Sequence, residues 1–208
     1  MSAPVFEVRE TGLPGCLELL PPRQRDARGG FVKVFHRDAF AALGLETDYP
    51  EEYYSRSRQG VLRGLHFQTP PAEHTKLVFC VEGRVQDVAL DLRAGSPTYG
   101  QHAVVELSAE AANAIYLPPG LAHGFCVLSD WATLVYKVSS QYSPEHDAGI
   151  LWNSAGIDWA VDAPILSERD AGHPALAVFV APFCFGTAPH PGPPPLAGEG
   201  ENRAGEGA

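Results

Sequence analysis

The chain has 208 residues, of which 45% are hydrophobic and 19% are charged, a balance typical of one folded domain and not of a disordered protein. The formal net charge of -10 argues against a nucleic-acid-binding protein, because phosphate backbones are bound by clustered Lys and Arg side chains. No apolar run approaches the roughly 20 residues that cross a bilayer. The first residues also lack the basic and apolar regions of a signal peptide, so we expect no membrane contact and a cytoplasmic location.

Short apolar or alternating runs, separated by Gly and Pro, continue from about Val5 to Phe185 and predict many strands and few helices. The clearest helix prediction is Arg37–Leu43, with Gly44 as the residue that ends it, and we expect such short helices at the periphery. The spacing of the strands fits an all-β jelly-roll barrel. In chain order the predicted strands are Phe31–Phe35, Leu77–Val81, Val85–Leu92, His102–Leu107, Ala114–Leu117, Gly124–Leu128 and Thr133–Val138.

The predicted strand Val85–Leu92 has two chemically different faces. Val88, Leu90 and Leu92 fall on one face, and Asp87 and Asp91 fall on the other, because side chains alternate along a strand. The acidic face either meets solvent or lines a polar cavity.

The folded domain is predicted to span residues 1–187. Residues 188–208 are rich in Pro, Gly, Ala and Glu and offer little to bury, so we expect a disordered tail without a catalytic role. Four cysteines, at positions 16, 80, 126 and 184, form no C-x-x-C pair, and we expect them to be reduced and buried.

Three segments combine reactive side chains with strand or turn residues: VLRGLHFQ at 61–68, PPGLAHGF at 118–125 and LVYK at 134–137. The second has the P-x-G-x-x-H form of a cupin motif. The first has His66-Phe67-Gln68 where a metal-binding cupin needs an H-x-H pair. Together with SPTYG at 96–100 and ILWN at 150–153, these segments resemble the dTDP-4-dehydrorhamnose 3,5-epimerase family over roughly Arg28 to Asp170.

The resemblance implies a cupin-type β-barrel that works without metal or cofactor, as a homodimer. It implies a nucleotide-diphosphate substrate that carries a 4-keto-6-deoxy sugar, with inversion at C3, C5 or both, in deoxysugar and surface polysaccharide biosynthesis. A ketone at C4 makes the C–H bonds at C3 and C5 acidic, provided that the enolate oxygen is stabilised.

By the family pattern, His66 is the catalytic base and Asp170 is the carboxylate that orients it. Such a pair is physically reasonable, since a carboxylate fixes the imidazole tautomer and supports the charge gained on proton abstraction. Tyr136 is the acid on the opposite side of the sugar ring. Lys76 is the partner of the enolate oxygen.

The same pattern gives a set of substrate-binding residues. Arg63 is expected near the phosphates or the sugar, and His123 near the reacting sugar. Tyr53 or Tyr54 is expected to stack on the base. The remaining members of the predicted binding set are Arg28, Gln68, Asp147 and Arg169.

A regular strand would point Arg63 and His66 to opposite faces. If both side chains reach one cavity, a bulge or twist is expected at Gly64, where the absence of a side chain permits it.

Some positions depart from the family pattern. The segment 51–57, EEYYSRS, lacks the Gln and Asn common there, Lys33 stands where Glu is common, and Asp147 replaces Glu. These departures predict a site that depends more on the diphosphate and the keto sugar than on the base.

Two alternatives stay open from the sequence. One is a metal-dependent cupin, such as a dioxygenase or sugar-phosphate isomerase, with His66, His74 and His123 as ligands. The other is a sugar-nucleotide-binding module without turnover. A physical argument also predicts the homodimer, because a strand around Phe31–Phe35 can cover the sheet edge of a second copy.

Overall fold

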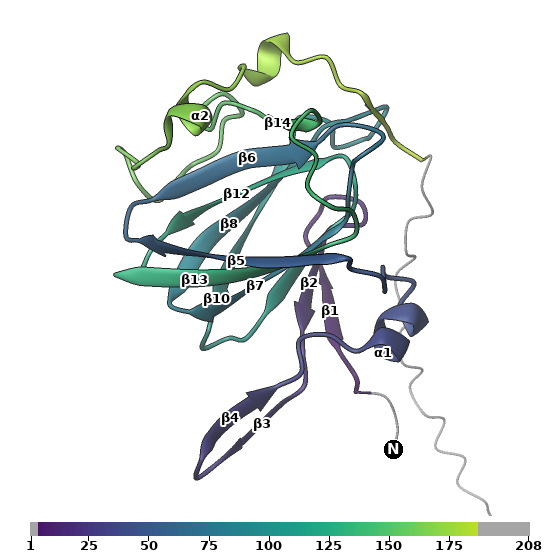
Figure 1. The fold of residues 1–208 in the computed structure, drawn as a ribbon, viewed down its shortest axis with the longest axis vertical. Helices are drawn as coiled ribbons and strands as arrows, with labels where there is room; N and C mark the ends of the chain where they lie inside the picture. The colour runs from purple at the N-terminus through teal and green to yellow at the C-terminus, as the bar shows by residue number, and fades with distance from the viewer. Residues whose placement is uncertain (1–3, 187–208) are drawn as a thin grey trace, which may run out of the picture.

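The structure, a computed structural model, describes residues 4–186, which form mostly strands (Figure 1). The N-terminal part contains β1 Glu7–Glu10, β2 Leu17–Leu20, β3 Arg23–Asp26, β4 Gly29–Val32, α1 Arg37–Ala42, β5 Glu51–Arg58 and β6 Leu62–Gln68. The middle part contains β7 Lys76–Glu82, β8 Arg84–Asp91, β9 Arg93–Ala94, β10 His102–Ser108, β11 Ala114–Leu117, β12 Leu121–Val127 and β13 Trp131–Val138. The last elements are β14 Asp147–Gly149, α2 Glu168–Ala171, the 3-10 helix η1 Leu176–Val178 and β15 Phe183–Cys184.

Two antiparallel sheets face each other to form the barrel. The six-stranded sheet has the order β1-β2-β11-β7-β13-β5, and the five-stranded sheet has the order β10-β8-β12-β6-β14. A separate hairpin, β3–β4, projects from the barrel, and the segment that carries α2 and η1 runs over the outside of the five-stranded sheet (Figure 1). No helix among residues 4–186 is long and apolar enough to span a bilayer.

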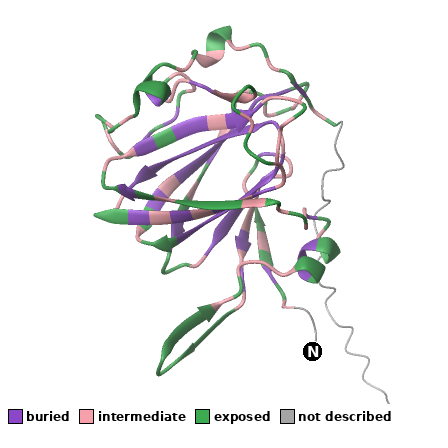
Figure 2. Ribbon diagram, in the orientation of Figure 1, coloured by how far each residue is buried: buried purple, intermediate pink, exposed green. Residues whose placement is uncertain are grey.

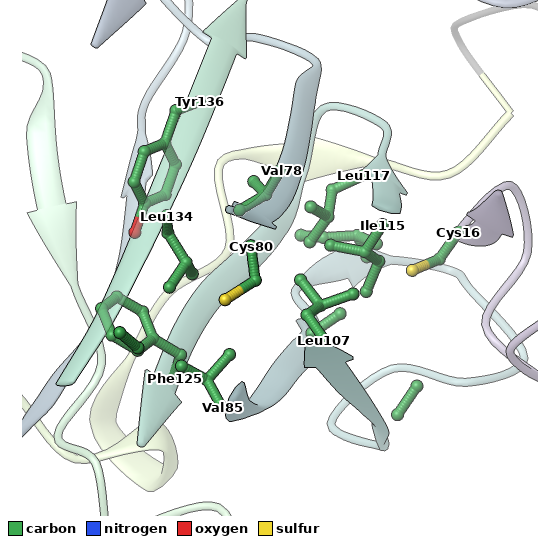
Figure 3. Close-up of a cluster of buried hydrophobic side chains, with 14 of the residues drawn as sticks. Cys16, Val78, Cys80, Val85, Leu107, Ile115, Leu117, Phe125, Leu134 and Tyr136 are labelled. Atoms are coloured by element: carbon green, nitrogen blue, oxygen red, sulfur yellow. The ribbon is translucent and has the colours of Figure 1, made fainter. Parts of the chain in front are cut away.

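Apolar side chains form three layers, one inside the barrel and one outside each sheet. The inner layer draws on strands of both sheets, with Val78 and Leu134 from the six-stranded sheet and Val85 and Leu107 from the five-stranded sheet (Figure 3). Phe40 of α1 packs on the outside of the six-stranded sheet, and Trp159 packs on the outside of the five-stranded sheet. Each sheet is therefore covered on both faces, which explains why many strands are buried along most of their length (Figure 2).

Most of the predicted strands and the helix are present. The helix α1 begins after His36, whose ring accepts a hydrogen bond from the Ala39 amide, and Gly44 follows its end with a φ of 69°. The strand predicted at Phe31–Phe35 lies earlier in the chain, because β4 ends at Val32. It pairs with β3 instead of joining the barrel.

The strands that were not predicted are β1, β2, β3, β5, β9, β14 and β15. They are short or, like EEYYSRSR in β5, lack apolar alternation. Pairing with β13 makes β5 a strand despite its polar composition.

The acidic face of β8 turns inward. Asp87 and Asp91 are fully buried, so the alternative in which this face meets solvent is wrong. Asp91 accepts hydrogen bonds from Arg93, Ser96 and Thr98. Cys16, Cys80 and Cys126 are buried as predicted, but Cys184 is exposed because β15 lies at the surface. The predicted tail, residues 188–208, lies outside the described residues.

The predicted irregularity at Gly64 is present. His123 of β12 pairs with His66, and Phe125 pairs with Arg63, so two steps along β12 match three steps along β6. The extra residue forms a bulge in β6. Gly64 has a φ of 122°, and a Cβ there would lie 2.6 Å from the Cα of Gly124. The two strands approach this closely only because both residues are glycines.

Gly124→Ala is expected to destabilise the fold. Its Cβ would lie 2.8 Å from the carbonyl oxygen of Arg63, and relieving this overlap should cost about 1–3 kcal/mol of the free energy of unfolding. Urea denaturation measures this loss. The matched control is Gly30→Ala, whose Cβ would meet no atom closer than 3.9 Å, and an equal loss in both variants would contradict the argument.

Candidate active site

A cavity of about 390 Å³ opens between the two sheets. Both sheets contribute to it, and so do the loops that follow β6 and β13. It contains most of the predicted site residues. Its lining consists of Glu51, Tyr53, Ser55, Arg63, His66, Phe67, Gln68, His74, Lys76, His123, Phe125, Tyr136, Val138, Tyr142, Asp147 and Arg169.

His66 and Asp170 form a close pair at the wall made by β6. His66 Nε2 lies 2.6 Å from Asp170 Oδ1. Asp170 sits in the short helix α2, where the Ser167 hydroxyl accepts a hydrogen bond from its backbone amide. With Nε2–H donating to the carboxylate, the lone pair of His66 is on Nδ1, as a general base requires.

Burial sets the protonation of this pair. Burial lowers the pKa of His66 below its ordinary value by more than its hydrogen bond to Asp170 raises it. Burial also favours the protonated form of Asp170, but the hydrogen bond and charge of His66 outweigh this and hold the pKa of Asp170 below its ordinary value. At neutral pH the pair is therefore a neutral imidazole beside a carboxylate.

Lys76 lies buried beside His66. Its Nζ donates to the backbone carbonyl oxygen of His66 at 3.0 Å. Burial lowers the pKa of Lys76 to about 8, against the opposing charges of Asp147 and Asp87. The side chain is a cation at neutral pH, positioned to stabilise an oxyanion in the cavity.

Tyr136 projects from β13 on the opposite sheet (Figure 3). Its ring stacks on Tyr53 at a centroid distance of 4.8 Å and meets the His123 ring edge-on at 6.0 Å. Burial raises the pKa of Tyr136 well above its ordinary value, so the phenol keeps its proton. His66 and Tyr136 thus face one cavity from different walls.

His123 and Arg63 also line the cavity. His123 Nε2 lies 2.8 Å from Asp87 Oδ2, and both side chains are buried. Arg63 donates to the Ser57 hydroxyl at 2.9 Å. The bulge at Gly64 is what lets Arg63 share the cavity with His66.

Three further predicted residues lie here but have partners in the protein. Gln68 donates to the Ala72 carbonyl oxygen at 2.7 Å and accepts from the Ser143 amide at 2.6 Å, so its side chain holds the two loops at the cavity rim. Asp147 pairs with Arg169 at 2.7 Å.

Two predicted binding residues do not reach the cavity. Tyr54 is 72% exposed, because alternation along β5 turns Tyr53 and Ser55 inward and Tyr54 outward. Arg28 lies at the tip of the β3–β4 hairpin, 90% exposed, and pairs with Asp26.

Sequence reasoning had not placed Ser55, Tyr142 or Asp87 in the site. Because side chains alternate along a strand, an inward Tyr53 on β5 also predicts that Ser55, two residues later, points inward.

The ligands named for the metal-dependent alternative do not converge among residues 4–186. The only group there with ligand atoms within 4.8 Å of one another contains His66, Asp170 and His173, not His74 or His123. His123 is held by Asp87, and His74 Nδ1 lies 3.1 Å from the Ser140 hydroxyl.

The family model for dTDP-4-dehydrorhamnose 3,5-epimerase matches residues 10–178, more than half of the chain. The chain belongs to this family. It is 45% identical over 168 residues to the dTDP-4-dehydrorhamnose 3,5-epimerase of Shigella flexneri, covering 79% of this chain and 93% of that protein. It is 42% identical over 168 residues to a dTDP-4-dehydrorhamnose 3-epimerase of Streptomyces niveus, covering 79% and 81%.

A solved epimerase from Legionella pneumophila, in complex with dTDP-4-keto-L-rhamnose, superposes with a TM-score of 0.81. It is 36% identical, and the match covers 85% of this chain and 95% of that one. The predicted family, cupin-type fold and isomerase class are confirmed, and the metal-dependent alternative is not favoured.

The pH profile of kcat/KM should be bell-shaped. Activity should fall in acid as His66 gains a proton, at a pH below 6.5 because the pKa is lowered. It should also fall as the pH rises through about 8, where Lys76 loses its charge. Initial rates of epimerisation across this range test both limbs. A rate that keeps rising well above pH 8 would contradict a role for the Lys76 cation.

Proposed function

We propose that this epimerase acts on a dTDP-linked 4-keto-6-deoxy sugar and inverts C3, C5 or both by metal-free proton transfer. The observation that carries the proposal is the placement of a His–Asp pair and a protonated tyrosine on different walls of one cavity. Inversion requires such a placement, because the proton leaves one face of the ring and returns to the other. Lys76 beside the pair supports an enolate intermediate.

Each inversion then has three participants. His66 Nδ1 takes the proton next to the ketone, and the electron pair of that C–H bond passes to the C4 oxygen as an enolate. The Lys76 cation stabilises this oxygen. Tyr136 donates a proton to the opposite face of the carbon, and the charge on the oxygen returns to the carbonyl. His66 has gained one proton and Tyr136 has lost one, so solvent must restore both before the next inversion.

The anionic end of the substrate fits the basic side chains at the cavity. Arg63 and Arg169 line it in a chain that is acidic as a whole, and a guanidinium binds phosphate oxygens through paired hydrogen bonds. Tyr53 offers an aromatic face near the rim. The weak dependence on the base, predicted from residues 51–57, stays a prediction, and so does the cytoplasmic location.

Hydrogen exchange in deuterated water tests the proposed roles. His66→Asn should abolish deuterium incorporation at C3 and C5 of dTDP-4-keto-6-deoxyglucose, because the base is needed for each deprotonation. Tyr136→Phe should keep exchange but lower the yield of inverted product by about 10²–10⁴-fold, since the enolate still forms. NMR of the recovered sugar measures both and shows which carbon is inverted.

The control for these variants is Tyr99→Phe, a change at an exposed tyrosine outside the cavity lining, which should keep both exchange and inversion. Near-normal turnover in His66→Asn would remove His66 from the mechanism. Equal losses of exchange and inversion in Tyr136→Phe would assign Tyr136 another role.

The β3–β4 hairpin supports the predicted homodimer. Its residues are exposed except for the half-buried Val32, and it projects away from the barrel (Figure 2). Phe31 is 61% exposed there. We infer that the hairpin packs on a second copy of the chain, which would also give Arg28 a binding role that it lacks within its own barrel.

Sedimentation at micromolar concentration should show a dimer for the native chain and a larger monomer fraction for Phe31→Asp, because a charge replaces the apolar contact. Val180→Asp, at another exposed apolar position, is the matched control and should stay dimeric. A fully active native monomer would contradict the dimer.

A further inference from the structure

A second histidine lies beside the His66–Asp170 pair. The ring of His173 meets the ring of His66 edge-on, with centroids 5.6 Å apart. Its Nε2 lies 3.8 Å from Asp170 Oδ1, which is too far for a hydrogen bond. This nitrogen is buried and has no hydrogen-bond partner within residues 4–186. A buried polar atom without a partner is unusual in a folded protein and requires an explanation.

Packing fixes the position of the His173 ring. A Cβ on Gly149 would lie 2.4 Å from His173 Nε2, so the ring occupies the space that a side chain would need. Gly149 pairs with His66 across β14 and β6, which brings the ring level with His66. The next residue is anchored as well, because the carbonyl oxygen of Pro174 accepts a hydrogen bond from the Leu151 amide. His173 is therefore held toward the pair by the backbone on both sides.

The three side chains together offer a metal-ligand set. One ligand atom from each of His66, Asp170 and His173 lies within 4.8 Å of the others. Two imidazoles and one carboxylate suit Zn²⁺ and similar divalent transition-metal ions. Tetrahedral Zn²⁺, with bonds of about 2.0–2.1 Å, places its ligand atoms about 3.4 Å apart, so the set fits after shifts of about 1 Å. His66 is 27% exposed and borders the cavity, which gives an ion a route of entry.

The ligand chemistry favours a cation. Each imidazole in its neutral form offers a lone pair on a ring nitrogen, and Asp170 offers a carboxylate oxygen. One carboxylate thus offsets half of the charge of a divalent cation, and water can supply a remaining ligand.

We propose that His66, Asp170 and His173 form a binding site for Zn²⁺ or a similar divalent transition-metal ion, and that the bound ion inhibits epimerisation. A metal bound at Nε2 of His66 takes the place of the proton that Nε2 shares with Asp170. A neutral imidazole then carries its proton on Nδ1, where the base needs a lone pair. The ion therefore switches off the base by tautomer exchange, without blocking the cavity.

The binding half of this proposal is independent of the proposed function, and the inhibition half rests on it. Calorimetric titration of the metal-free, full-length protein with zinc chloride tests binding. The native chain should bind one Zn²⁺ at this site, and His173→Gln should weaken that binding about tenfold or more. His102→Gln is the matched control, since His102 lies on β10 outside the cavity lining and should change nothing.

Activity measurements on the same proteins test inhibition. Zinc should inhibit the native enzyme and the control, and a chelator should restore full activity. His173→Gln should be active without zinc and should need about tenfold more zinc for half-inhibition. The thermal midpoint of each variant shows that its fold is retained, and His173→Asn repeats the test with a second side chain.

The possible results separate the two proposals. Equal zinc binding by the native chain and both His173 variants would overturn the site. Weakened binding with unchanged zinc sensitivity, or activity that increases with zinc, would overturn inhibition through His66. Binding that depends on His173 in a protein without epimerase activity would leave the metal site standing while the proposed function fails.

Discussion

The close approach of β6 and β12 at Gly64 and Gly124 is the constraint on which the site depends. A regular β6 would place Arg63 on the outer face with Leu65 and Phe67, in the apolar layer under the C-terminal segment. The extra residue at Gly64 turns Arg63 inward and keeps His66 inward as well. Any side chain at either glycine would separate the two strands. The bulge at Gly64, which contains no reactive side chain, thus determines which reactive side chains share the cavity.

Electrostatics inside the cavity follow from pairing. Each of three carboxylates has a basic or imidazole partner: Asp87 with His123, Asp147 with Arg169, and Asp170 with His66. The Arg169 guanidinium offsets the charge of Asp147 at the cavity, which would otherwise repel a diphosphate. Lys76 is placed differently, because its ammonium group contacts a backbone carbonyl and not a carboxylate. Burial lowers the pKa of Lys76 to about 8 because it disfavours the charged form, so Lys76 stays a cation only below that pH.

The sequence predicted which residues lie together at the cavity better than it predicted how the chain brings them there. Family resemblance predicted Asp170 together with His66, Tyr136 and Lys76, although Asp170 follows His66 by 104 positions, a separation that no local pattern can interpret. Alternation along β5 explains why Tyr53 faces the cavity and Tyr54 does not. This rule can be applied only when the bounds of β5 are known. The sequence showed that β8 has one apolar and one acidic face. Which of them turns inward depends on the sheet that packs against β8, and the strand's own sequence does not contain that information. Arg28 lies in an exposed hairpin away from the cavity and pairs with Asp26, a placement that the local sequence does not predict.

The segment that covers the outside of the five-stranded sheet affects how the enzyme loses its activity when it unfolds. His66 belongs to the barrel, but Asp170 belongs to the segment that packs on the barrel from outside through residues such as Ile157 and Trp159. Segments held by one apolar layer can open without global unfolding. Detachment of this segment would remove Asp170 and Arg169 together and leave a folded barrel in which nothing fixes the tautomer of His66. Under heat or denaturant, the protein should therefore stop being a catalyst before its barrel unfolds.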